Sequence, residues 1–161
     1  MADWFIVNAA EAPALRHDRA GTYIRFESPD HRFPDFGINI HILRPGEPNG
    51  KYHAEEAQED FLVLHGECIA IIDDQEHPLR EWDFVHCPAG TEHIFVGAGT
   101  GPCAILMVGA RGPDRGIRYP VNALAARYGA SVTRETPDPK EAYADWPGEY
   151  TPTHLDWPLT P

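Results

Sequence analysis

The stretch "KYHAEEAQEDFLVLHGE", residues 51–67, places one histidine and four acidic residues directly ahead of an apolar run and a glycine. A chain that needs only a soluble surface scatters its acids, so this crowding calls for a structural reason. In a β-strand, alternate side chains share a face, so His53 and Glu55 are expected to point the same way.

The second half of the stretch reads as another strand. Its alternation directs Glu59, Phe61 and Val63 toward the interior and leaves Glu56 and Asp60 exposed. A carboxylate buried without a partner costs several kcal/mol or more. The inward acid therefore needs a partner inside the protein.

A second candidate histidine, His93, lies about thirty residues beyond this predicted strand. The segment "PAGTEH", residues 88–93, delivers His93 onto a predicted strand with Phe95 on the same face. Two neutral imidazoles and one or two carboxylates that converge in an apolar interior form a ligand set for a divalent cation. Iron, manganese, nickel and zinc all accept such ligands.

The composition limits the possible partners. The chain has 161 residues and a formal net charge of −12, which disfavours binding to nucleic acid or to an anionic membrane. Its longest apolar run is too short to span a bilayer, and the first residues lack a signal-peptide pattern, so we expect a cytoplasmic protein. The three cysteines show neither disulfide nor zinc-ribbon spacing, and we expect them to be small buried residues.

Short strands at close spacing dominate the pattern between residues 36 and 110, with turn residues between them. This is typical of an all-β sandwich or barrel. The expected strands are residues 4–7, 22–26, 36–43, 52–55, 60–64, 67–72, 77–80, 84–87, 92–96 and 103–110.

The last third of the chain differs. Residues 120–128 and 139–146 are predicted to form short helices, the first closed by Gly129 and the second opened by a proline. The proline-rich tail carries Tyr150 and Trp157, and we expect it to dock on the barrel or on a partner subunit.

The first stretch resembles the first motif of the cupin superfamily, which is a glycine, H-x-H, three or four residues, a glutamate, six residues and a glycine. The matching positions are Gly46, His53, Glu55, Glu59 and Gly66. The gap after the first glycine is one residue longer than usual, and a glutamate stands where cupins usually have the second histidine.

The stretch "WDFVHCPAGTEHIFVG", residues 82–97, resembles the second cupin motif. Pro88, Gly90 and His93 are in register with it. Trp82 stands where the motif has a glycine, and Gly97 where it has an asparagine.

The resemblance implies a small single-domain cupin, that is, an all-β double-stranded β-helix (jelly-roll) barrel with a small helical C-terminal extension. Residues 1–161 would form one domain, divided into N-terminal strands (1–35), the barrel core (36–110) and the extension (111–161). It implies one divalent metal ion held by His53, Glu59 and His93 together with Glu55, and cavity walls formed by Phe61, Val63 and Phe95.

Several functions are compatible with this resemblance. We expect a metal-dependent enzyme that acts on a small organic molecule, first an oxidoreductase of the dioxygenase type, with isomerisation or decarboxylation also allowed. We expect it to dimerise through outer positions such as Leu62 and Leu64. A non-catalytic ligand-binding cupin, with a structural or absent metal, is the alternative. A third possibility is a triad of His53, Glu55 and His93 with a keto-acid cosubstrate held by Arg44 or Arg111.

Overall fold

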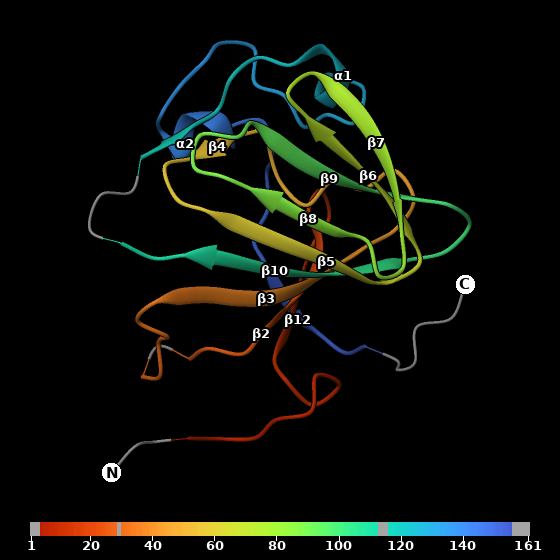
Figure 1. Cartoon of the computed structure of the whole chain (residues 1–161), viewed down its shortest axis with the longest axis vertical. Helices are drawn as coiled ribbons and strands as arrows, with labels where there is room; N and C mark the ends of the chain where they lie inside the picture. The colour runs from red at the N-terminus through yellow and green to blue at the C-terminus, as the bar shows by residue number, and fades with distance from the viewer. Residues whose placement is uncertain (1–3, 29, 113–115, 156–161) are drawn as a thin grey trace.

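The computed structural model describes residues 4–28, 30–112 and 116–155. Twelve strands and two short helices occur in the described part of the chain, and the strands dominate it (Figure 1). The strands are β1 (Ala14–His17), β2 (Gly21–Arg25), β3 (Phe36–Leu43), β4 (Ala54–Glu55), β5 (Glu59–His65), β6 (Glu67–Ile72), β7 (Gln75–Arg80), β8 (Phe84–Cys87), β9 (His93–Ala98), β10 (Cys103–Ala110), β11 (Ile117–Arg118) and β12 (Thr151–Thr153).

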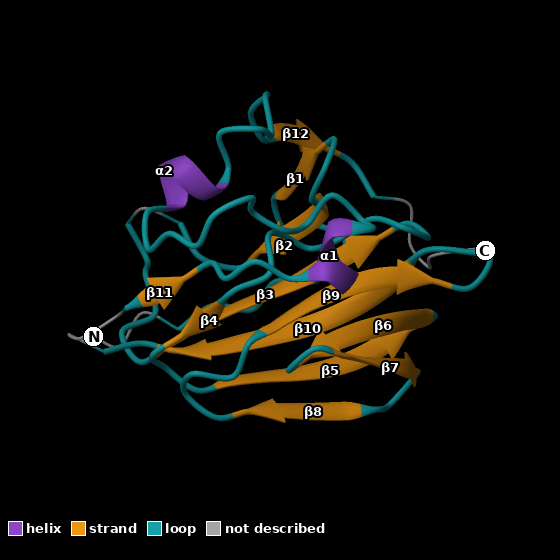
Figure 2. Ribbon diagram, turned by 90° about the horizontal axis from the view of Figure 1, so that it is seen from above, coloured by secondary structure: helices purple, strands orange, loops and turns teal. Residues whose placement is uncertain are grey.

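Two antiparallel sheets build the barrel. The larger sheet has seven strands in the order β12-β1-β2-β3-β10-β5-β8, and the smaller has three in the order β7-β6-β9. Figure 2 shows the two sheets as layers, with β4 and β11 paired beside them. This arrangement confirms the predicted all-β jelly-roll barrel with a small helical extension.

The main core lies between the two sheets. Phe61 and Val63 on β5 point into it with 3% and 1% of their surface exposed, which confirms the inward face predicted from the alternation. Phe95 on β9 contributes from the opposite sheet. Burying such large apolar side chains stabilises the fold by about 1.5–3 kcal/mol each.

The outer face of the larger sheet is apolar as well. Ile24, Ile40 and Ile42 form a second cluster there, and Leu64 packs against it from β5. Part of this face is covered by Ala12 of the N-terminal segment. The dimer expected through this face stays a prediction.

The N-terminal segment departs from the sequence prediction. Residues 4–7 are extended but pair with no strand in the described chain, and Trp4 and Ile6 expose 81% and 90% of their surface. Apolar residues of high β propensity suggested a strand, but a strand forms only where a neighbour supplies backbone hydrogen bonds. The pattern likewise missed β1, β11 and β12, which are short and irregular in hydrophobicity.

Both predicted helices occur but are shorter than expected, since α1 spans Ala123–Ala126 and α2 spans Pro139–Ala142. Asn122 and Asp138 cap their N-termini through side-chain oxygens. Gly129 has a positive φ of 68° just after α1, as predicted from its place in the sequence. Within the described residues, no helix is long and apolar enough to cross a membrane.

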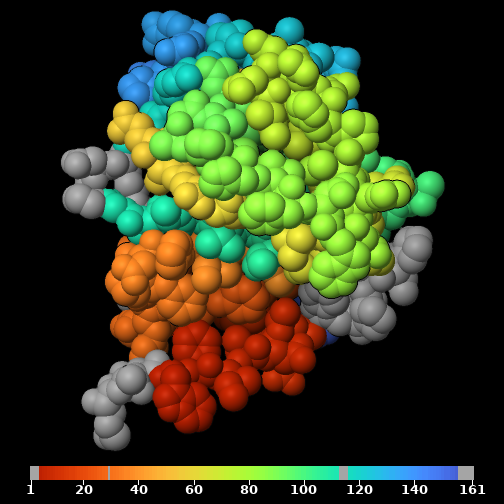
Figure 3. Space-filling model, in the orientation of Figure 1, coloured from red at the N-terminus to blue at the C-terminus, as the bar shows by residue number. Residues whose placement is uncertain are grey.

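The C-terminal extension packs on the barrel through an apolar cluster, which joins Ile71 and Ile94 to Ala125 and Ala130, and through one buried lysine. Lys51 is fully buried, and its ammonium group donates to the carbonyls of Gly129 and Ser131 and to Asp145 at 2.8 Å. It also lies 4.9 Å from the ring centre of Trp146. Figure 3 shows the extension (blue) at one end of the visible face and the N-terminal residues (red) at the other.

The tail returns to the larger sheet. Tyr150 lies against the rings of His17 and Tyr23 at 5.0 and 5.1 Å, next to the β12–β1 pairing. The part of the docking prediction that concerns Trp157 lies outside the described residues. Cys68, Cys87 and Cys103 are buried and free, as expected.

Candidate metal centre

The two motif histidines are joined through their backbones. His53 directly precedes β4, and His93 begins β9. The His53 N–H donates to the His93 carbonyl at 3.2 Å, and the His93 N–H donates to the His53 carbonyl at 2.8 Å. This bridge brings the two imidazole centres to 4.8 Å from each other.

A backbone carbonyl orients each imidazole. Nδ1 of His53 lies 2.8 Å from the Lys51 carbonyl, and Nδ1 of His93 lies 3.0 Å from the Thr91 carbonyl. Because a carbonyl only accepts hydrogen bonds, both Nδ1 atoms carry the proton. Each Nε2 is then left with a free lone pair, the form in which histidine binds metals.

Glu59 completes the group from β5. Its Oε2 lies 3.3 Å from Nε2 of His93 and 3.9 Å from Nε2 of His53. One donor atom from each of the three residues lies within 4.8 Å of the other two. The structure thus brings together three of the four predicted ligands.

The electrostatics of this group fit a cation. Burial, assisted by the charge of Glu55, raises the pKa of Glu59 to about 8. Burial lowers the pKa of His53, and burial together with His53 lowers the pKa of His93 to about 3. Without a cation, the raised pKa of Glu59 favours its protonated form, whereas a divalent cation between its oxygen and the two imidazole lone pairs would stabilise the carboxylate.

Glu55 lies outside the three-residue group. It sits on β4, where it pairs with Ile117, and its charge acts on both His53 and Glu59. The geometry favours Glu59 over Glu55 as the carboxylate of the group. A role for Glu55 as a fourth ligand stays a prediction.

The predicted cavity residues surround the centre on its apolar side. The Phe61 ring lies 4.4 Å from that of Phe95 and 5.2 Å from that of His93. Val63 belongs to the same buried cluster. These side chains give the histidines an apolar environment, and their contact with a substrate stays a prediction.

The other candidate residues have different roles. His86 is paired with Asp60 at 2.6 Å and His65 with Glu81 at 2.9 Å, both on the surface. Arg111 forms a bidentate ion pair with Glu27, and Arg44 is exposed. Sequence reasoning missed Arg25 and Asn39, because no motif marks them. Arg25 and Asn39 lie on the interior face of the larger sheet, together with His41.

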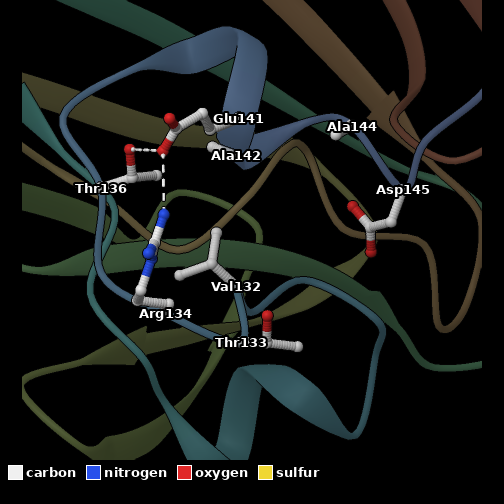
Figure 4. A pocket seen from close by; sticks show the side chains of 8 residues that line it. All are labelled: Val132, Thr133, Arg134, Thr136, Glu141, Ala142, Ala144 and Asp145. Carbon is white, nitrogen blue, oxygen red and sulfur yellow. Dashed lines mark hydrogen bonds and ion pairs between the residues drawn. The ribbon is translucent and has the colours of Figure 1, made fainter.

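A surface cavity of about 440 Å³ lies apart from the histidines, in the C-terminal extension (Figure 4). Its polar groups satisfy one another, since Glu141 accepts from Thr136 at 2.7 Å and lies 3.8 Å from Arg134. None of its lining residues is a candidate ligand. The lining residues are Val132, Thr133, Arg134, Thr136, Glu141, Ala142, Ala144 and Asp145.

The comparisons agree with this geometry. Residues 39–109 match the family profile of the cupin domain. The match covers the barrel core from β3 to β10, the region that contains both motifs. No curated protein sequence matches it significantly.

Two solved structures are similar to this chain. A sugar phosphate isomerase of the cupin superfamily from Silicibacter pomeroyi is 30% identical, with a TM-score of 0.53 over 60% of this chain and 62% of that protein. The chain thus spans less than two thirds of that relative. The polyketide cyclase RemF from Streptomyces resistomycificus is 17% identical, with a TM-score of 0.60 over 70% of this chain and 84% of that one, and shows the fold alone.

Both departures of this chain from the second cupin motif have a structural explanation. Trp82 has a φ of 71°, the left-handed conformation that glycine adopts without cost, so the turn keeps its shape although the residue has changed. At Gly97 a Cβ atom would lie 2.2 Å from the Arg44 carbonyl oxygen. Glycine at this position permits a close approach of two backbone segments.

Proposed function

We propose that the chain is a metal-dependent enzyme of the isomerase type, which binds one divalent cation through His53, Glu59 and His93. The observation that carries the proposal is the cluster itself, in which three donor atoms within 4.8 Å of one another are set in an apolar barrel. Three protein ligands leave coordination positions for the oxygens of a small molecule. The similarity to a sugar phosphate isomerase supports isomerisation over oxygenation.

The cation and the protein residues would have different parts in the chemistry. A bound cation would supply Lewis acidity, which polarises a carbonyl or hydroxyl oxygen of the substrate. The carbonyls of Lys51 and Thr91 keep both imidazoles in the ligating tautomer. The packed rings of Phe61 and Phe95 exclude water from one side of the centre.

Glu55 is the carboxylate available for proton transfer in this proposal. It lies close enough to influence His53 and Glu59 electrostatically, yet it is outside the three-residue group. An isomerase that moves a hydrogen between neighbouring carbons needs such a base. Glu55→Gln would then retain the metal but lose activity.

The first experiment measures metal content. Protein purified without added metal is analysed by mass spectrometry for iron, manganese, nickel and zinc, and the measurement is repeated on His53→Ala, His93→Ala and Glu59→Gln. His65→Ala is the control, because His65 is a surface histidine paired with Glu81. We expect about one equivalent of metal in the wild type and the control and less than a tenth in the other variants. Wild-type protein that binds no metal when titrated with these cations would disprove the proposal.

The second experiment tests the reaction. The metal-loaded enzyme is incubated in D₂O with hydroxyaldehydes and hydroxyketones, and exchange of the hydrogen next to the carbonyl is followed by proton NMR. We expect exchange with the wild type and none with Glu55→Gln. A metal-loaded protein that binds these compounds without exchange would support the non-catalytic alternative.

A further inference from the structure

Buried polar atoms without partners gather on one side of the barrel. Four such side-chain atoms occur among the described residues: Arg25 Nε, Asn39 Oδ1, His41 Nδ1 and Tyr52 Oη. The first three lie on the adjacent strands β2 and β3. Native proteins leave few buried polar groups unpaired, so three on neighbouring strands need an explanation.

The strand register places these residues on the interior face. Arg25 lies opposite Asn39, Asn39 opposite Met107, and Met107 opposite Phe61. Directly opposed residues of antiparallel strands share a face, and Phe61 contacts the ring of His93. The row therefore runs along the same face as the candidate metal centre.

Two glycines lie next to Glu59 on the face of the sheet that Arg25 and Asn39 share. Glu59 lies opposite Gly109, and Gly109 lies opposite Gly37, so two glycines follow Glu59 across the sheet. Among the described residues, a Cβ atom at Gly109 would meet only atoms of Glu59 within 4 Å, the nearest at 3.8 Å, whereas one at Gly37 would meet the Arg111 guanidinium at 3.4 Å. Gly109 therefore leaves the carboxyl group of Glu59 uncovered by a side chain on that strand.

The charges along this face favour an anion. The guanidinium of Arg25 has no hydrogen bond or ion pair with any described residue, whereas that of Arg111, which lies against Gly37, is neutralised by Glu27. Burial lowers the pKa of His41 to about 4, which keeps its imidazole neutral. Nε of Arg25 is buried without a partner although the side chain as a whole is partly exposed, and an anionic ligand that accepts from Nε would satisfy this donor.

We propose that Arg25, Asn39 and His41 form a subsite that binds the carboxylate or phosphate group of a hydroxylated substrate whose other end reaches the metal centre. Arg25 binds the anion, and Asn39 Oδ1 accepts a hydrogen bond from a hydroxyl group. At about 4.8 Å per strand, three strand spacings separate Arg25 from Phe61, so the span is at most about 14 Å. This inference rests on the proposed function and names its substrate class.

Three probes test the subsite: glycerate for a carboxylate, glycerol 3-phosphate for a phosphate, and glycerol as the uncharged reference. Their binding to wild type, Arg25→Gln, Asn39→Ala and Arg127→Gln is measured by titration calorimetry, with and without bound metal. Arg127 is the control because it is an exposed arginine that pairs with Glu76. Arg25→Lys, which keeps the charge but removes Nε, is measured as well.

We expect the wild type and Arg127→Gln to bind one anionic probe at least tenfold more tightly than glycerol. Arg25→Gln should lose this preference at least tenfold, Asn39→Ala should lose part of it, and Arg25→Lys should be intermediate. The anion that binds more tightly identifies the source as carboxylate or phosphate.

Stability gives an independent readout. Because Arg25 has no partner to lose, Arg25→Gln should unfold at the same or a higher denaturant concentration than the wild type. A wild type that binds neither anion, or an Arg25→Gln variant that keeps the preference, would overturn the subsite. Metal content separates this failure from that of the proposed function, since Arg25→Gln should retain a full equivalent of metal.

Discussion

His53 and His93 exchange both of their backbone hydrogen bonds, at 3.2 and 2.8 Å, so the two candidate metal ligands form one antiparallel β-bridge. The bridge joins the two motifs through histidines that are forty residues apart in the chain. Since backbone atoms form it, the bridge does not depend on the imidazoles. The site is therefore positioned by the fold before any metal arrives.

This relationship predicts that loss of an imidazole impairs metal binding more than folding. We expect the free energy of unfolding of metal-free His53→Ala to lie within about 1 kcal/mol of the wild type. A cation at 100 times its Kd should stabilise the wild type by about 2.7 kcal/mol and leave the variant unchanged. Urea denaturation with and without Mn²⁺ measures both effects, and equal stabilisation of the two proteins would contradict the ligand assignment.

The left-handed backbone of Trp82 predicts that glycine at this position is more stable than alanine. Trp82 exposes 72% of its surface, so little packing is lost on its removal, and glycine adopts its φ of 71° without strain. Trp82→Gly should be about 1 kcal/mol more stable than Trp82→Ala, because alanine keeps the strain. Thermal unfolding of the two variants isolates the backbone effect, which would be absent if alanine were as stable as glycine.

The close approach at Gly97 predicts a destabilising substitution. A Cβ atom there would clash with the Arg44 carbonyl at 2.2 Å, whereas one at Gly112 would have no atom of the described residues within 4 Å. Gly97→Ala should lower the free energy of unfolding by at least about 2 kcal/mol, and Gly112→Ala by less than about 0.5 kcal/mol. Chemical denaturation compares the pair, and similar values would mean that the strand edge can move apart.

The ion pair of Glu27 and Arg111 predicts a pH dependence. Hydrogen bonds from Arg111, the nearest at 2.5 Å, hold the pKa of Glu27 below its ordinary value. The pair's contribution is thus complete above the unfolded pKa of about 4.3 and is lost as the pH falls through the lower folded value.

Glu27→Gln should therefore cost about 1 kcal/mol at pH 7 and progressively less as the pH falls below 4. Stability curves at several pH values measure this difference. Glu149→Gln, at an exposed position, is the control and should show no comparable change. A constant difference between wild type and Glu27→Gln at all pH values would argue against the pair.

The buried ammonium of Lys51 predicts that the C-terminal extension depends on it. Lys51→Met keeps the length of the side chain but leaves the carbonyls of Gly129 and Ser131 without their donor. We expect a loss of about 1–3 kcal/mol, against less than about 0.5 kcal/mol for Lys140→Met, since Lys140 is exposed. Limited proteolysis should also release the extension more readily in Lys51→Met, and equal resistance would show that other contacts hold it.

Much of the barrel was predictable from the sequence. The strands β3, β6, β8 and β10 have the predicted bounds, because β3 alternates strictly and turn residues flank all four locally. Residues 4–7 misled the prediction, since an apolar run shows propensity but not whether a neighbouring strand exists. The short strands β1, β11 and β12 form only because the fold brings their partners alongside.

The candidate metal centre was likewise predictable only in part from the sequence. Spacing and alternation alone marked His53, Glu59 and His93 as inward residues with metal-ligand chemistry. Only the tertiary structure decided that Glu59, and not Glu55, completes the group, because this depends on how β4 and β5 are placed relative to β9. The row of Arg25, Asn39 and His41 was likewise invisible in the sequence, since its members become neighbours only through cross-strand register, a relation between distant segments that no local pattern encodes.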